Sequence, residues 1–179
     1  MNLLLIGLRA SGKSSVARAV APRLGLAHVD LDELAPRVLG FATPAEVFRG
    51  VGEPAFRDAE RRVLSDALRA DGQVIALGGG TPMVPGVADA IREAQRDRRA
   101  HVVYLLADAG TLRDRLRATN LADRPGLLGP DPLAEIEALL SDRDPLYRDL
   151  ADEVIEVGPL DLDQVCGEVV LSYIGVSRG

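Results

Sequence analysis

The chain has 179 residues, 47% of them hydrophobic, and its mean hydropathy of +0.08 is typical of one soluble globular domain. The net charge of −6 disfavours nucleic-acid binding, and the 3% aromatic content without tryptophan disfavours stacking on single strands. The single cysteine excludes an internal disulfide and fits a reducing cytoplasm, and the first apolar run is too short to span a membrane.

The first predicted element is a buried strand at residues 3–6, which leads into a glycine-rich loop. Residues 7–14, Gly-Leu-Arg-Ala-Ser-Gly-Lys-Ser, fit the G-x-x-x-x-G-K-[ST] pattern of loops that wrap nucleotide phosphates, and a helical pattern follows. In such a loop the lysine reaches the β- and γ-phosphates, and the hydroxyl binds Mg²⁺. Lys13 is the only lysine of the chain. The pattern predicts a nucleoside triphosphate site, in preference to a plain glycine-rich turn.

Two aspartates, Asp30 and Asp32, follow the second predicted strand at residues 26–29. In parallel α/β folds, ligands bind beyond the carboxyl ends of the strands. One carboxylate there suits a magnesium shell, and the other suits a hydroxyl that must lose its proton. The alternative is that one aspartate caps the helix that follows. The neighbouring phosphate loop favours the functional interpretation.

Two further helices are predicted, one from the capping box at residues 43–46 and one after Gly52-Glu53-Pro54. Arg57 and Glu60 lie three residues apart on the second of them. They can form an ordinary exposed ion pair, or Glu60 can hold Arg57 toward an anion. Both interpretations stand on the sequence alone.

The third predicted strand, residues 73–77, ends in Gly78, Gly79 and Gly80. Three residues without a Cβ let a ligand lie directly on the backbone, so we expect ligand contact here more than a flexible turn.

The rest of the chain continues to alternate between strands and helices, which indicates a parallel sheet covered by helices. Strands are expected at 101–106 and 153–157, and helices at 85–99, 109–118, 133–141 and from about 161. Residues 119–132 are the longest loop-like stretch. They are typical of a lid that closes over phosphates, with a plain surface loop as the alternative.

In their order and spacing, these motifs resemble the shikimate kinase family. The resemblance rests on the phosphate loop, the segment Asp30–Leu34, the G-E-x-x-F-R-x-x-E pattern of Gly52–Glu60, the three glycines, Arg124-Pro125 and Arg143–Tyr147. It implies one kinase domain over residues 1–179, with a three-layer α/β P-loop kinase fold. The sheet would have five parallel strands in the order 2-3-1-4-5 with helices on both faces. A substrate-binding subdomain would lie at about 31–62 and the lid at about 119–132.

The resemblance also implies transfer of the γ-phosphoryl group of ATP, with Mg²⁺, to the 3-hydroxyl of shikimate. Asp32 would be the general base, and Lys13 and Arg124 would neutralise the transferring group. The implied acceptor-binding residues are Asp32, Arg57, Gly78, Gly79, Gly80 and Arg143. The implied nucleotide-binding residues are Ala10, Ser11, Gly12, Lys13, Ser14, Ser15, Arg117 (against the adenine) and Arg124. Ser14 and Asp30 would bind the magnesium ion.

The sequence departs from the family pattern at three places. Ala10 stands where the family usually has glycine, Gly126 interrupts the Arg-Pro-Leu-Leu run of the lid, and no arginine follows the last strand near Gly158. Two alternative functions remain, another small-molecule kinase such as a gluconate kinase and a catalytically inactive nucleotide-binding regulator. Arg57 and Arg143 favour an acceptor with a carboxylate. We expect a cytoplasmic monomer that binds small molecules, without a nucleic-acid or membrane partner.

Overall fold

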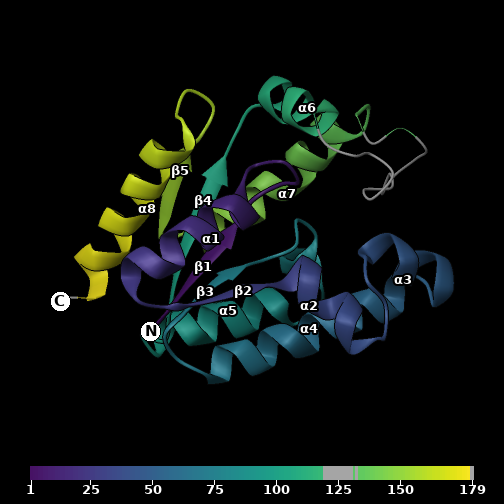
Figure 1. The fold of residues 1–179 in the computed structure, drawn as a ribbon, viewed down its shortest axis with the longest axis horizontal. Helices are drawn as coiled ribbons and strands as arrows, with labels where there is room; N and C mark the ends of the chain where they lie inside the picture. The colour runs from purple at the N-terminus through teal and green to yellow at the C-terminus, as the bar shows by residue number, and fades with distance from the viewer. Residues whose placement is uncertain (119–130, 132, 178–179) are drawn as a thin grey trace.

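The apolar runs of the sequence form one parallel sheet with the strand order β2-β3-β1-β4-β5 (Figure 1). The computed structural model describes residues 1–118, 131 and 133–177. The strands are β1 (Asn2–Ile6), β2 (Ala27–Asp30), β3 (Gln73–Ala76), β4 (Ala100–Leu106) and β5 (Glu153–Glu156). The predicted sheet order 2-3-1-4-5 is therefore confirmed.

Eight α-helices and one short 3₁₀-helix accompany the sheet within the described ranges. They are α1 (Lys13–Leu24), α2 (Leu31–Val38), α3 (Pro44–Gly50), α4 (Glu53–Arg69), η1 (Thr81–Met83), α5 (Val87–Arg96), α6 (Ala109–Arg117), α7 (Ile136–Leu150) and α8 (Leu162–Ser177). None of these helices is long and apolar enough to cross a membrane.

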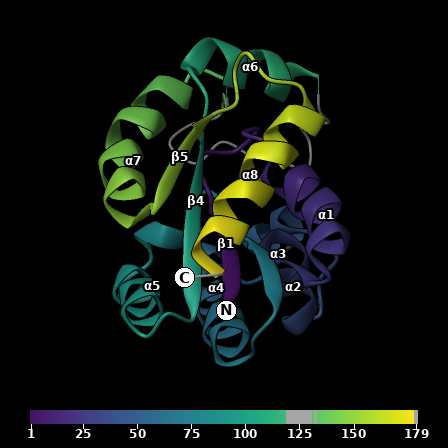
Figure 2. The ribbon, with the colours of Figure 1, turned by 90° about the vertical axis from the view of Figure 1, so that its left-hand side faces the viewer.

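The helices cover both faces of the sheet because successive strand residues point to opposite sides. Leu3 and Leu5 of β1 pack into a core with α1, α6 and α8, whereas Leu4 and Ile6 pack into a second core with α4 and α5. Figure 2 shows α1 and α8 on one side of the sheet and α5 on the other. The three layers are those predicted from the sequence.

A third, small core joins α2, α3 and α4 beyond the carboxyl end of β2. It consists of Ala35, Val47, Phe56 and Ala59, with Phe48 packed against Phe56 edge to face at a centroid distance of 5.1 Å. One half of the predicted capping box at the start of α3 is present, because Thr43 Oγ1 accepts a hydrogen bond from Glu46 N at 3.2 Å, while Glu46 Oε2 accepts from Ala42 N at 2.8 Å, one residue before the cap. This core fixes the start of α2 relative to the start of α4.

Helix α7 is longer than the prediction of a helix at residues 133–141. The prediction placed Arg143-Asp144-Pro145 after the helix, and a proline has no N–H to donate within a helix. The structure continues the helix through Pro145 to Leu150. Leu139, Arg143, Tyr147 and Leu150 are buried along one face, and their packing outweighs the hydrogen bond that proline cannot form. Arg143 therefore projects from a helix.

Candidate active site

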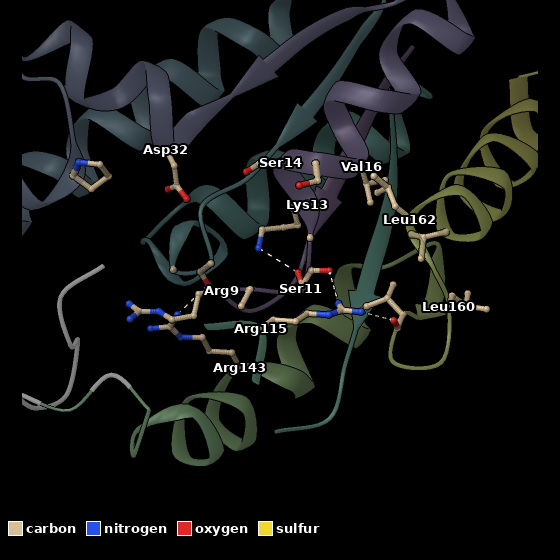
Figure 3. A pocket seen from close by; sticks show the side chains of 18 of the residues that line it. Arg9, Ser11, Lys13, Ser14, Val16, Asp32, Arg115, Arg143, Leu160 and Leu162 are labelled. Carbon is tan, nitrogen blue, oxygen red and sulfur yellow. Dashed lines mark hydrogen bonds between the residues drawn. The ribbon is translucent and has the colours of Figure 1, made fainter. Parts of the chain in front are cut away.

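A cavity of about 480 Å³ lies at the carboxyl end of the sheet (Figure 3). Its lining comes from the phosphate loop and α1, from α2, α3 and α4, from the turn after β3, from α6 and α7, and from residues 157–165, which follow β5 and enter α8. This is the edge at which parallel α/β folds bind their ligands. The cavity has a half built on the phosphate loop and a half built on Gly79 and Gly80.

The phosphate loop has the backbone shape that its glycines predict. Gly7 has φ +143°, and a Cβ there would lie 2.7 Å from the carbonyl oxygen of Leu105. Gly12 has φ +99° and precedes α1, which has no side-chain cap at its N-terminus. Lys13 Nζ donates to the carbonyl oxygens of Gly7 and Leu8, both at 2.9 Å. A backbone curled around one ammonium in front of an uncapped helix start is suited to phosphate.

Arg57 and Arg143 line the other half of the cavity. Arg57 Nη1 donates to Glu60 at 2.7 Å, and its Nε and Nη2 donate to Glu53 at 3.0 and 2.8 Å. Its guanidinium lies within 3 Å of the position that a Cβ on Gly80 would take. Burial alone would lower the pKa of Arg57. The hydrogen bonds and negative charges of Glu60 and Glu53 outweigh this effect, so the pKa lies above its usual value and the side chain stays charged. The pair is therefore not an ordinary exposed ion pair, because Glu60 is buried and holds Arg57 at the cavity lining; that Arg57 is aimed at an anion stays a prediction.

Glu60 is completely buried below the cavity. It accepts hydrogen bonds from Arg57 and from the hydroxyl of Thr81. Burial raises the pKa of its carboxyl, the Arg57 charge opposes this, and the negative charge of Asp32 adds to the rise. A Cβ on Gly78 would lie within 2.8 Å of oxygens from Glu60, Asp32 and Thr81. Gly78 is thus needed so that these three side chains can converge.

Arg143 reaches Gly79 from α7. Its Nη1 donates to the Gly79 carbonyl at 3.0 Å, and the Tyr147 hydroxyl donates to the same oxygen. Burial raises the pKa of Tyr147 to about 12, although the positive charge of Arg143 opposes the rise. Arg143 Nε is buried and has no hydrogen-bond partner within the described residues. A buried guanidinium with an unpaired donor is suited to an anionic ligand.

The two aspartates have different surroundings. Asp30 is buried and caps α2, because its Oδ1 accepts a hydrogen bond from Asp32 N at 3.0 Å. Asp32 is exposed in the first turn of α2 and lines the cavity. The cap interpretation is therefore confirmed for Asp30, and the same hydrogen bond fixes the backbone from which Asp32 projects.

Comparison with known proteins identifies the family. The family model for shikimate kinase matches residues 9–173. The chain belongs to the shikimate kinase family. The shikimate kinase of Symbiobacterium thermophilum is 39% identical over 170 residues, which cover 95% of this chain and 94% of that protein.

Solved structures support the assignment. The structure of shikimate kinase from Acinetobacter baumannii in complex with shikimate has a TM-score of 0.86 at 29% identity and covers 97% of this chain and 93% of that chain. A gluconokinase from Sinorhizobium meliloti, with a TM-score of 0.64 at 16% identity and coverage of 99% and 91%, shares the fold alone. This member of the shikimate kinase family is an ATP-dependent kinase, as predicted.

In this shikimate kinase family member, the structure brings most of the predicted site residues to one cavity. The lining residues that were predicted are Ala10, Ser11, Gly12, Lys13, Ser14, Ser15, Asp32, Arg57, Gly79, Gly80 and Arg143. Gly78 and Asp30 do not line the cavity, but both contact Asp32, which does. Arg124 and the predicted lid, apart from Asp131, lie outside the described residues.

Arg117 does not reach the cavity of this kinase. Its side chain is 61% exposed and pairs with Asp114 at 3.1 Å. Arg115 lines the cavity instead, where it donates to the carbonyl oxygens of Ser11 at 3.5 Å and Val157 at 2.8 Å. Residues two apart on a helix point about 200° apart, so only one of them can face the loop. The structure thus places Arg115 at the cavity and Arg117 outside its lining, an orientation that the apolar face of α6 at Leu112 and Leu116 indicates.

Ala10 of the phosphate loop adopts φ +65°, a left-handed conformation that costs an alanine about 1–2 kcal/mol. Replacing Ala10 with glycine should raise the free energy of unfolding by about 0.5–1 kcal/mol and Tm by about 2–3 °C. The matched control is Ala19→Gly within α1, which should lower stability by about 1 kcal/mol. If thermal unfolding shows that both variants lose stability equally, Ala10 is not strained.

Proposed function

We propose that this kinase transfers the γ-phosphoryl group of ATP to the 3-hydroxyl of shikimate, which gives shikimate 3-phosphate and ADP. The observation that carries the proposal is a pair of guanidiniums in the same cavity as the phosphate loop. Arg57 lies at Gly80, and Arg143 lies at Gly79. A planar guanidinium matches a carboxylate, and shikimate has one. The A. baumannii enzyme, whose structure is described with shikimate, supports this assignment.

Asp32 is proposed to accept the proton of the attacking hydroxyl. It is the only carboxylate that lines the cavity among the described residues. Its backbone is fixed by Asp30 and its neighbours Glu60 and Thr81 are held by hydrogen bonds. Phosphoryl transfer depends mostly on positioning and charge stabilisation, so an aligned hydroxyl with a nearby base suffices for the acceptor.

Lys13 is proposed to neutralise charge on the transferring group, together with Arg124. The backbone of residues 10–15 would bind the phosphates, and we propose Arg115 in place of Arg117 as the cation on the nucleotide side of α6. The Ser14 hydroxyl and the Asp30 carboxylate are oxygen donors of the kind that Mg²⁺ prefers, so these residues fit a magnesium ion. When bound, the ion would offset the negative charge of the β- and γ-phosphates.

We further propose that residues 1–179 act as one kinase domain with the acceptor region at about 31–62 and a lid at about 119–132. The small core of α2, α3 and α4 supports the acceptor region, because it joins the elements that carry Asp32 and Arg57. A cytoplasmic monomer remains the proposal for location and assembly, and gel filtration with light scattering tests the assembly.

The proposal is tested by ADP release from Mg·ATP with shikimate, gluconate or no acceptor. Strong stimulation by shikimate alone is the expected result. Stimulation by gluconate would make the acceptor different, and no stimulation by either with ATP still bound would favour a regulatory nucleotide-binding protein. The gluconokinase likeness does not support gluconate, because it concerns the fold alone.

Gly80→Ala should raise the KM for shikimate about tenfold with the KM for ATP unchanged. The added Cβ would lie 2.9 Å from both terminal nitrogens of Arg57, and that flexible side chain would move away from its position over Gly80. A charge-assisted hydrogen bond that is lost in this way is worth about 1.5–3 kcal/mol. Gly167→Ala in α8 is the control for a glycine replaced elsewhere, because it lies outside the cavity lining and nothing lies within 4 Å of the added Cβ. An unchanged KM for shikimate would separate Gly80 from acceptor binding.

A further inference from the structure

Arg9 is a cation of the cavity that the proposed mechanism leaves without a role. The described lining contains Arg9, Lys13, Arg57, Arg115 and Arg143, against the single carboxylate of Asp32. Lys13 and Arg115 bond to carbonyls of the phosphate-loop half, and Arg57 and Arg143 contact Gly80 and Gly79. Arg9 belongs to the phosphate loop by sequence, so its place between the two halves decides what it can bind.

The backbone of Arg9 adjoins the acceptor half. A Cβ on Gly79 would lie 3.1 Å from Arg9 N, and the carbonyl of the same glycine accepts a hydrogen bond from Arg143. The third residue of the loop is thus in contact with the same turn that Arg57 of α4 and Arg143 of α7 contact. Figure 3 shows the Arg9 side chain leaving the loop on the side of Arg143, while Lys13 folds toward Ser11.

The side chain of Arg9 is held by a buried partner. Its Nη1 lies 3.3 Å from Glu135 Oε1, and the two side chains are only 15% and 4% exposed. Glu135 immediately precedes α7, the helix that carries Arg143. A buried carboxylate costs free energy unless it is paired, so this pair fixes the guanidinium toward α7 and away from the nucleotide half.

We propose that Arg9 is a third arginine that binds the carboxylate of the acceptor, with Glu135 as its positioning residue. This rests on the proposed function, and it adds a residue of the phosphate loop to acceptor recognition. Contact between the nucleotide loop and the acceptor anion would also favour acceptors that carry a negative charge over neutral polyols. Discrimination by charge complementarity of this kind depends on cations fixed in place before binding.

Arg9→Met keeps the length and apolar stem of the side chain and removes the charge. The expected result is about a tenfold loss of kcat/KM for shikimate, mainly through KM, with the KM for ATP within twofold of wild type. Arg9→Lys should recover part of the loss, because it restores charge without the planar fork. Arg69→Met, which removes an exposed arginine of α4, is the matched control and should behave as wild type.

Arg9→Met leaves Glu135 buried without its guanidinium and can lower stability for that reason alone. The double variant R9M/E135Q removes this charge as well, so its Tm should be close to that of the wild type while the KM for shikimate stays about tenfold raised. A KM that returns to the wild-type value in the double variant would reduce Arg9 to a partner for Glu135 and overturn the proposal.

A second experiment repeats the R9M kinetics with shikimate methyl ester, which has no carboxylate charge. The R9M loss should fall below twofold with the ester, and an equal loss with both acceptors would show that Arg9 does not bind the carboxylate. Wild-type enzyme without shikimate-dependent turnover overturns the proposed function and this inference together. Active wild type with unchanged R9M kinetics overturns the inference alone.

Discussion

Replacing Asp32 with asparagine should lower the turnover number by about 10²–10⁴-fold, while the affinity for ATP stays within twofold of the wild type. The amide has the same shape as the carboxylate but cannot accept the proton of the attacking hydroxyl. Asp32 is the one carboxylate of the described cavity lining. Glu60 is buried and already bonded to Arg57 and Thr81, so it is badly placed to replace the lost base.

The measurement is ADP release at saturating shikimate and Mg·ATP, with nucleotide titration to establish binding. Asp66→Asn, an exposed aspartate of α4, is the control and should keep wild-type turnover. The Tm of D32N should also match the wild type, because the capping bond of α2 uses the backbone N–H of residue 32 and the side chain of Asp30. A variant that keeps more than a tenth of the turnover would exclude Asp32 as the base.

The sequence was enough to predict the fold and the site residues that belong to one continuous segment. The phosphate loop is one continuous segment, and its shape follows from Gly7 and Gly12 at positive φ. The sheet order followed from the family resemblance, and the alternation of apolar runs supported a parallel sheet. The loop and the parallel sheet follow from local pattern, whereas the strand order came from the resemblance.

The remaining features depend on packing between distant segments. A carboxylate with the spacing of Asp30 can cap a helix, bind a metal ion or do both; the hydrogen bond from Asp32 N to its Oδ1 shows the cap, and the magnesium role stays a proposal for the same carboxylate. Arg115 and Arg117 differ in which face of α6 they occupy, which the core at Leu112 and Leu116 decides. The sequence did not predict a role for Arg9 in the site, since its partner Glu135 lies 126 residues further along the chain.

The glycines after β3 show how the acceptor half depends on absent side chains. Gly78 leaves room for Glu60, Asp32 and Thr81, while Gly79 admits the backbone of Arg9 and Gly80 the guanidinium of Arg57. Glycine was predicted here for contact with a ligand. In the structure these positions first allow the protein's own charged groups to converge on the site.

Replacing Arg57 with lysine should raise the KM for shikimate more than tenfold, with the KM for ATP unchanged. The substitution keeps the positive charge, so any loss reports the geometry of the guanidinium. Arg57 uses Nε and Nη2 on Glu53 and Nη1 on Glu60, and the side chain is only 21% exposed. A lysine ammonium is a single point that cannot join both glutamates and also present a flat pair of donors to a carboxylate. It would be drawn to Glu60, which is completely buried and must keep a positive partner.

The measurement compares KM for shikimate and for ATP in R57K and in Arg62→Lys, an exposed arginine on the same helix whose replacement should leave both constants unchanged. A rise in both KM values of R57K together with a fall in Tm would indicate a general disturbance of α4. A rise for shikimate alone assigns Arg57 to the acceptor carboxylate, because the phosphate loop, which is proposed to bind ATP, is built on β1 and α1 and does not depend on α4 for its shape. Unchanged kinetics would remove Arg57 from the acceptor site and leave its pair with Glu60 as a structural feature of α4.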